Sequence, residues 1–296
     1  MGTVTAPEPT SVAWTDGDVT VAGLWTYHWG DRKRPYLHPV ATPAGHVLTR
    51  NEPEDHPWHH GLWFTIKFVD GDNFWEEMPP YGVLRHDGAP EVTAGADGTV
   101  ELAGRLTWTK ADRETVALTE HRRITHVPIA GGPTDPDGAY AIDLDTTLVP
   151  AFDLRIERTE YTTWGGYGGL TLRGSADLVD TRLLLTDGST HDRLVGVSSP
   201  WCDLTGTMSG TEAAAGLALF DHPSNPSFPT PFYASTFDGY GEGAWTNFFN
   251  AAFLFHDGLD LSAGEALRIR HRALVHDGSW STERLRDAWA TWAARS

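Results

Sequence analysis

The chain has 296 residues, of which 22 are Lys or Arg and 40 are Asp or Glu, so its formal net charge at pH 7 is −18. This charge argues against nucleic acid as a partner, because binding to a phosphate backbone depends on clustered basic residues. No apolar run approaches the roughly 18 residues that span a bilayer, and the start, MGTVTAPEPT, lacks the features of a signal peptide. We therefore expect a cytoplasmic protein without a membrane partner.

Asp-Gly pairs occur along the whole chain and predict a series of antiparallel hairpins. This dipeptide favours tight hairpin turns, because a type I′ turn requires positive φ at both of its central residues. The nine pairs begin at Asp16, Asp70, Asp87, Asp97, Asp137, Asp187, Asp238, Asp257 and Asp277.

Several runs between these pairs alternate apolar and polar residues, which indicates strands with one solvent-facing side. The predicted strands are VTVAGLW (19–25), HGLWFTIKFV (60–69), TVELAGRLTWT (99–109), AIDLDTTLV (141–149), FDLRIERTEYT (152–162), AGLALF (215–220) and ALRIRHRALV (266–275).

The last segment, STERLRDAWATWAARS, predicts a helix over about residues 281–295. Leu285, Trp289 and Trp292 would share one face, and Ser281 is a suitable N-cap. No clear linker divides the chain, and GGPTDPDG (131–138) is interpreted as a long hairpin loop. We therefore predict a single all-β domain over residues 1–296, a large twisted antiparallel β-sandwich with a short C-terminal helix.

Residues 55–64 read DHPWHHGLWF and place three histidines, His56, His59 and His60, within five residues. His56 and His59 have the His-x-x-His separation that can present two imidazoles to one metal ion. A third ligand could come from Asp55, Glu76, Glu77 or His222. The spacing is weak evidence by itself, so a divalent metal is a possible cofactor here and none is assigned. Acid–base chemistry or substrate hydrogen bonding by these histidines is the preferred interpretation.

A second Asp-His-Pro occurs in DHPSNP (221–226), which places His222 as His56 is placed in the first. Prolines and aromatic residues crowd the chain that follows. A pyranose offers apolar C–H faces for aromatic rings and hydroxyls for polar groups, so such a segment could line a sugar cleft. We predict a two-sided pocket with His59, His60 and His222 as catalytic residues. The predicted substrate-binding residues are His56, Trp63, Glu77, Arg173, Asn225 and Tyr233.

Several motifs in order resemble the bacterial family of unknown function that bears the label methane oxygenase PmoA. The motifs are HPWHHGLWF, VDGDNFWEE, GGYGGLTLRGS, SSPWCDLTGTMSG, GLALFDHPSNP and LRIRHRALVHDG. The resemblance extends from about residue 20 to residue 280. It implies a β-sandwich similar to the galactose-mutarotase superfold, with members often encoded near sugar-degrading enzymes and sugar oxidoreductases.

The PmoA label does not suit this chain, since a particulate methane monooxygenase subunit is an integral membrane protein. Where many relatives have His-His-Arg-Gly, this chain has His59-His60-Gly61 without the Arg. If that Arg recognises a charge on the substrate, this chain lacks the residue that would do so.

Epimerising or cleaving a sugar requires a proton donor and a proton acceptor with pKa values near the working pH, which histidine and carboxylate can supply. We predict a carbohydrate-active enzyme that uses this chemistry for epimerisation, isomerisation or glycosidic-bond cleavage on a small-molecule or oligosaccharide substrate. The alternatives are a non-catalytic carbohydrate-binding protein and a metal-dependent hydrolase or lyase centred on His56 and His59. No pair of Asp or Glu stands out as the carboxylate pair of an ordinary glycosidase.

Overall fold

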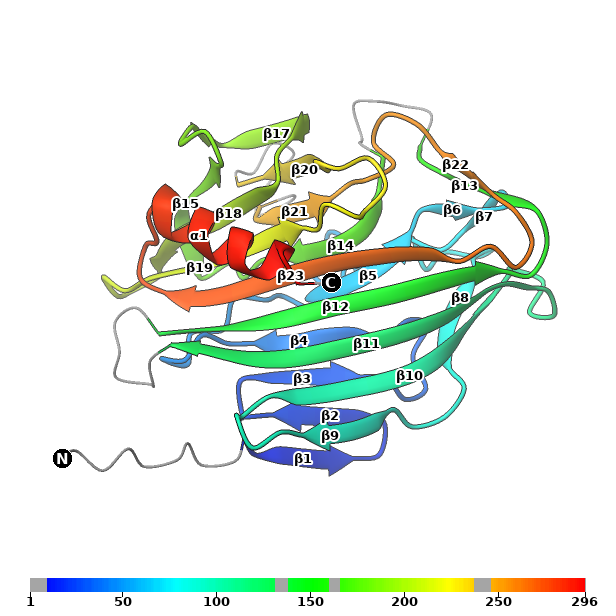
Figure 1. Cartoon of the computed structure of the whole chain (residues 1–296), viewed down its shortest axis with the longest axis horizontal. Coiled ribbons are helices and arrows are strands. Elements are labelled where there is room, and N and C mark those ends of the chain that lie inside the picture. Colours follow the sequence, from blue (N-terminus) through cyan, green and yellow to red (C-terminus); the bar gives the residue numbers. More distant parts are fainter. Residues whose placement is uncertain (1–9, 131–137, 160–165, 237–245, 296) are drawn as a thin grey trace.

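The computed structural model describes residues 10–130, 138–159, 166–236 and 246–295. It confirms the predicted all-β class, because two large antiparallel sheets pack face to face and a single helix lies near the C-terminal end of the described chain (Figure 1). That helix, the one described, is too short to cross a membrane.

The first sheet has nine strands in the order β1-β2-β3-β4-β5-β14-β21-β20-β17. These strands are β1 (Val12–Thr15), β2 (Asp18–Val21), β3 (Trp25–His28), β4 (Tyr36–Val40), β5 (Leu62–Ile66), β14 (Gly168–Arg173), β17 (Arg193–Ser198), β20 (Pro231–Ser235) and β21 (Phe248–Ala251).

The second sheet has ten strands, in the order β16-β15-β18-β19-β23-β12-β11-β10-β8 with β9 also paired to β10. These strands are β8 (Val83–His86), β9 (Glu91–Ala94), β10 (Val100–Thr109), β11 (Val116–Ala130), β12 (Ala139–Pro150), β15 (Leu178–Leu185), β16 (Thr190–His191), β18 (Trp201–Met208), β19 (Ala214–Asp221) and β23 (Leu267–Asp277). A small third sheet contains β6 (Phe68–Val69), β7 (Asp72–Asn73), β13 (Leu154–Glu157) and β22 (Leu259–Leu261).

The alternating pattern of β5 places different side chains on the two faces of the first sheet. Leu62, Phe64 and Ile66 enter the hydrophobic core between the sheets, because residues two apart on a strand share a face. Trp63 points to the opposite face, where it joins a separate aromatic cluster. All five residues of β5 are buried, so this strand is covered on both sides.

A charged pair lies inside the sandwich. Glu120 and Arg122, both on β11, are almost fully buried, and Arg122 Nε lies 2.6 Å from Glu120 Oε1. Trp108 Nε1 donates to the other carboxylate oxygen at 2.8 Å, and the hydroxyl of Thr146 also donates to Glu120. The pair therefore has the additional hydrogen bonds that a buried ion pair requires.

The predicted hairpins are confirmed in part. Four of the Asp-Gly pairs, at Asp16, Asp70, Asp97 and Asp187, close hairpins between consecutive strands. In three of these four only the glycine has positive φ, whereas Asp70 and Gly71 have φ of 48° and 80°, as a type I′ turn requires. The pairs that include Asp137 and Asp238 involve residues outside the described ranges, as does most of the predicted loop 131–138.

The predicted strand 19–25 is wrong as a single element. Ala22 and Gly23 have positive φ of 55° and 67° and form a turn between β2 and β3. The sequence pattern misses this turn, because Ala rarely adopts positive φ.

The helix α1 (Thr282–Ala293) confirms the C-terminal prediction. The hydroxyl of Ser281 accepts a hydrogen bond from the backbone N–H of Arg284 at 3.2 Å, as an N-cap does. Leu285 and Trp292 are buried, and they pack with side chains of the second sheet that include Phe220. The helix therefore covers part of the outer face of that sheet (Figure 1).

Glu120→Gln is expected to lower the free energy of unfolding by about 3–5 kcal/mol, because Arg122 would stay charged and buried without its carboxylate. Glu101→Gln is a matched control, since Glu101 lies 3.1 Å from Arg123 on the exposed face of β10 and β11. The control substitution should lower the free energy of unfolding by less than about 1 kcal/mol. Urea unfolding measures both changes, and equal losses would contradict the special role of the interior pair.

Candidate functional site

The histidine cluster lies on the face of the first sheet that points away from the core. The chain from Arg50 to Gly61 folds back on itself, with hydrogen bonds from Glu52 N to His59 O and from Gly61 N to Arg50 O. Gly61 has φ of 56°, and a Cβ at this position would lie 2.4 Å from the carbonyl oxygen of Leu37. Only glycine fits there without a shift of the backbone. Gly61 therefore allows the chain to pass close to Leu37, and this close approach sets the position of His59 and His60 just before β5.

His60 and Glu77 form a hydrogen-bonded pair. His60 Nε2 lies 2.8 Å from Glu77 Oε1, and His60 Nδ1 lies 3.1 Å from the amide oxygen of Asn51. The His60 ring is stacked on Tyr36 with ring centroids 4.7 Å apart. The imidazole is therefore held in place on both its nitrogens and on one face.

Two further cations contact the same carboxylate. Lys33 Nζ lies 2.7 Å from Glu77 Oε2, and Arg34 Nε lies 3.5 Å from Oε1. Burial by itself would raise the pKa of Glu77, but the hydrogen bond with His60 and the charges of Arg34 and Lys33 lower it from 4.5 to about 2. Glu77 is therefore ionised at neutral pH.

His59 is in a different environment from His60. It is 1% exposed, and Arg173 Nη1 lies 3.3 Å from its Nδ1. Burial and the neighbouring positive groups, among them His56 and Arg173, hold the pKa of His59 well below its usual value, so the ring is neutral. Because the guanidinium can only donate, Nδ1 is the acceptor and the ring proton is on Nε2.

Arg173 ties the histidine segment to the sheet. It is fully buried on β14, and its Nη2 lies 2.9 Å from Asp55 Oδ2. The same carboxylate oxygen lies 2.7 Å from His56 Nδ1. Arg173 thus has the carboxylate partner that a cation within a sheet needs.

The two predicted metal ligands, His56 and His59, do not present converging nitrogens. Their rings are stacked, with centroids 4.7 Å apart and planes 17° apart. Arg173 donates toward His59 Nδ1 and Asp55, where a cation would have to lie. Among the residues that the structure describes, no group of three His, Cys, Asp or Glu side chains is arranged to hold an ion. The metal-centred alternative therefore has no ligand set in the described part of the chain.

A cross-strand row builds the floor of the site. Tyr36, Trp63, Thr171, Asn250 and Tyr233 are paired in register from β4 through β5, β14 and β21 to β20. The aromatic members belong to one buried cluster with Trp75, Tyr167, Phe248 and Phe255, against which the half-buried Trp58 packs.

Seven of the predicted site residues come together here. His59 contacts His56, Trp63 and Arg173. The Phe248 ring lies between His59 and Tyr233, with its centroid 5.2 Å from that of His59 and 5.9 Å from that of Tyr233. The neighbouring His60 is hydrogen-bonded to Glu77. Their catalytic and binding roles stay predictions.

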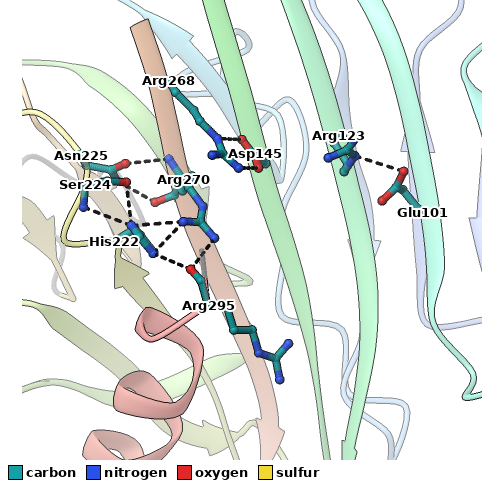
Figure 2. Close-up of polar contacts among 9 residues, drawn as sticks. All are labelled: Glu101, Arg123, Asp145, His222, Ser224, Asn225, Arg268, Arg270 and Arg295. Carbon is teal, nitrogen blue, oxygen red and sulfur yellow. Dashed lines mark hydrogen bonds and ion pairs between the residues drawn. The ribbon is translucent and has the colours of Figure 1, made fainter.

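His222 is not part of this group. It follows β19 of the second sheet, and Figure 2 shows it beside Arg270 at the end of α1. Its Nε2 lies 2.8 Å from Arg270 Nη1, and Arg270 Nη2 donates to the carbonyl oxygen of Arg295 at 3.0 Å. The ring also meets Trp292 edge-on at 5.3 Å. The predicted pocket between two Asp-His-Pro segments is therefore wrong, because the segments belong to different sheets and His222 anchors the helix.

Asn225 likewise has a structural position. Its amide donates to the carbonyl oxygen of Arg270 at 2.6 Å and accepts from the backbone N–H of the same residue at 2.7 Å (Figure 2). It also donates to the buried Asp221 at 2.7 Å. The amide thus pairs with β23 as a strand neighbour would, and the predicted substrate contact of Asn225 is not supported.

Several residues of the cluster were not predicted from the sequence. They are Lys33, Arg34, Lys67, Trp75 and Tyr167, with Trp75 and Tyr167 stacked at 4.8 Å. The run Arg32-Lys33-Arg34 was the available signal, because three consecutive basic residues are unusual in a chain with 22 basic and 40 acidic residues.

A depression lies elsewhere, on the outer face of the second sheet. It has a volume of about 510 Å³ and is lined by side chains of β9 to β12 and β23, including His121, Arg123 and Arg268. Arg123 is paired with Glu101 and Arg268 with Asp145 (Figure 2). These exposed ion pairs are typical of a solvated sheet face, so we place no chemistry there.

A family model of unknown function, DUF6807, matches residues 16–290. The chain belongs to this family. No curated protein matches the chain. Among solved structures, the α-galactosidase from Lactobacillus brevis aligns with 10% identity and a TM-score of 0.33, over 93% of this chain and 40% of that protein. The chain thus spans less than half of that enzyme, and a similarity this low carries no argument about activity.

His222→Ala is expected to loosen α1, because it removes contacts to Arg270 and Trp292. Loss of about 1 kcal/mol corresponds to roughly fivefold faster hydrogen exchange of the helix amides. His121→Ala, an exposed histidine on β11, is the control and should leave this exchange unchanged. Unaltered helix exchange in His222→Ala would show that His222 does not anchor the helix.

Glu77 predicts a specific pH dependence of stability. Because its folded-state pKa is depressed to about 2, its contribution is complete above its usual pKa of 4.5 and is lost as the pH falls toward about 2. The difference in free energy of unfolding between wild type and Glu77→Gln should therefore shrink between about pH 5 and pH 2. Urea unfolding across this range measures it, and a constant difference would contradict the depressed pKa.

Proposed function

We propose that this protein is a carbohydrate-active enzyme in which His60, oriented by the ionised Glu77, carries out acid–base chemistry on a sugar. The reaction would be epimerisation, isomerisation or glycosidic-bond cleavage. The observation that carries the proposal is the 2.8 Å hydrogen bond between His60 and an ionised Glu77, beside Lys33 and Arg34.

His60 is suited to accept a proton from the substrate. Burial lowers its pKa and Glu77 raises it, with lowering as the net effect, so the ring is neutral before reaction at neutral pH. Both nitrogens lie next to acceptors, Glu77 Oε1 and Asn51 Oδ1. With its N–H directed at Glu77 Oε1, the neutral ring has its lone pair on Nδ1, so the substrate would approach at Nδ1 and replace the contact with Asn51 Oδ1. Nδ1 would then take up the substrate proton, and Glu77 would stabilise the imidazolium that forms.

The cations beside Glu77 are suited to the charge that develops on the substrate. When a proton leaves a sugar carbon or hydroxyl, negative charge grows on an oxygen, and fixed positive groups stabilise it. Lys33 Nζ and the Arg34 guanidinium are such groups, and both contact the carboxylate that orients His60.

Solvent reaches this group along one edge. The side chain of Lys33 is 48% exposed and that of Glu77 is 10% exposed, whereas His59 is buried. The half-buried Trp58 offers an aromatic ring on the same segment as the histidines. A sugar could therefore stack on Trp58 and present its hydroxyls to the polar edge.

The test is a panel of reducing sugars and glycosides incubated with the protein in D₂O. NMR would detect deuterium uptake at carbon, new epimers, or released reducing ends. His60→Gln should lower the rate about 10²- to 10⁴-fold, the usual contribution of a general base. Glu77→Gln, which removes the carboxylate that orients His60, should lower the rate as well. His121→Gln, on the outer face of the other sheet, is the matched control and should keep the wild-type rate.

Retained turnover in both site variants, with intact folding by circular dichroism, would overturn the assignment. Sugar-dependent quenching of tryptophan fluorescence without any product would instead support the non-catalytic carbohydrate-binding alternative.

A further inference from the structure

We propose that the sugar bound at this site carries a carboxylate, as a uronate or aldonate does, and that Arg34 binds that group. The inference rests on the proposed function and names its substrate class. The described structure supplies too few hydrogen-bond acceptors for the buried guanidinium of Arg34.

Arg34 is a buried cation with an unmet donor. It precedes β4 and is 2% exposed. Its Nη2 donates to the carbonyl oxygen of Trp75 at 2.5 Å, whereas Nη1 is buried and has no hydrogen-bond acceptor. The Nη1 atom carries two N–H groups.

The nearest carboxylate to Arg34 is already in use. Glu77 Oε1 bonds His60 at 2.8 Å and Oε2 bonds Lys33 at 2.7 Å, which leaves Arg34 Nε at 3.5 Å from Oε1. One carboxylate therefore serves three basic side chains. Arg34 is the least well paired of them, although it is the most buried of the three.

Such an arrangement is costly for the protein by itself. A buried charge is normally paired, and a buried charged donor without an acceptor carries its full desolvation penalty. A ligand carboxylate at Nη1 would supply the missing acceptors and the opposite charge. A neutral hydroxyl would satisfy one N–H group but would not compensate the charge.

Two further buried polar atoms lie around the same tryptophan. Trp63 Nε1 has no acceptor, and its ring lies 5.5 Å from that of Trp75. Glu76 Oε2, in the residue after Trp75, has no donor, while its Oε1 is bound by Lys67. With Arg34 Nε and Nη1, the group has three unmet donors and one unmet acceptor, which suit a ligand that carries a carboxylate and a neighbouring hydroxyl.

The charge balance of the group argues against a phosphorylated sugar. Lys33, Arg34 and Lys67 bring three positive charges against the two negative charges of Glu76 and Glu77, so one ligand carboxylate would balance the group. A phosphate, which carries up to two negative charges, would leave an excess that Glu76 and Glu77 repel.

The test compares matched ligands by tryptophan fluorescence and by the D₂O assay. Glucuronate, galacturonate and mannuronate are paired with glucose, galactose and mannose, and with their 6-phosphates. Wild type should bind at least one uronate about tenfold or more tightly than its neutral parent, the effect of one charge-assisted hydrogen bond. Arg34→Gln should abolish this preference, and Arg34→Lys, which keeps the charge, should retain part of it.

Arg123→Gln is the matched control, because Arg123 is exposed and paired with Glu101 on the other sheet. It should keep the wild-type preference. Equal affinity for uronates and neutral sugars, a preference for the phosphates, or no uronate binding would overturn the inference. Turnover of neutral sugars without a uronate preference would leave the proposed function in place. Arg34-dependent uronate binding without turnover would support the inference and contradict the catalytic role.

Discussion

The carboxylate of Glu77 connects parts of the chain that are distant in sequence. Lys33 and Arg34 precede β4, and His60 precedes β5. Lys33 contacts one oxygen of the Glu77 carboxylate, and Arg34 and His60 contact the other. A partly buried carboxylate with three basic neighbours stays ionised, and it holds each neighbour in a fixed position relative to the others. Glu77 therefore sets the orientation of His60 and the positions of Lys33 and Arg34. Because its oxygens are already bound by His60 and Lys33, it also leaves Arg34 short of hydrogen-bond acceptors.

The first sheet provides the rigid base that such a cluster needs. Arg173 on β14 holds Asp55, and Gly61 lets the backbone pass close to Leu37, so the histidine segment is fixed at two points. Aromatic side chains cover the sheet beneath it, and they keep His59 dry and neutral. Side chains held by packing and by further hydrogen bonds are the condition for precise acid–base chemistry.

The all-β class and the C-terminal helix were predicted from the sequence, because alternation and capping are local properties. Seven of the nine predicted site residues lie together, since four of the seven lie on β5 or in the segment just before it. Arg173 was predicted to bind substrate, and in the structure its guanidinium pairs with Asp55 of the histidine segment. His222 was misplaced because a repeated Asp-His-Pro says nothing of which sheet each copy joins; β19 carries it to α1. Arg34 was missed because its lack of hydrogen-bond acceptors follows from the contacts that Glu77 makes with His60 and Lys33. Those contacts can be seen only in the three-dimensional structure.

A crystal structure of the protein soaked with a uronate would show directly whether Arg34 and His60 form a sugar-acid site. We expect ligand density with the carboxylate within hydrogen-bond distance of Arg34 Nη1 and a sugar carbon or hydroxyl beside His60. Density on the outer face of the second sheet near Arg268, with the surroundings of Arg34 and His60 empty, would contradict it.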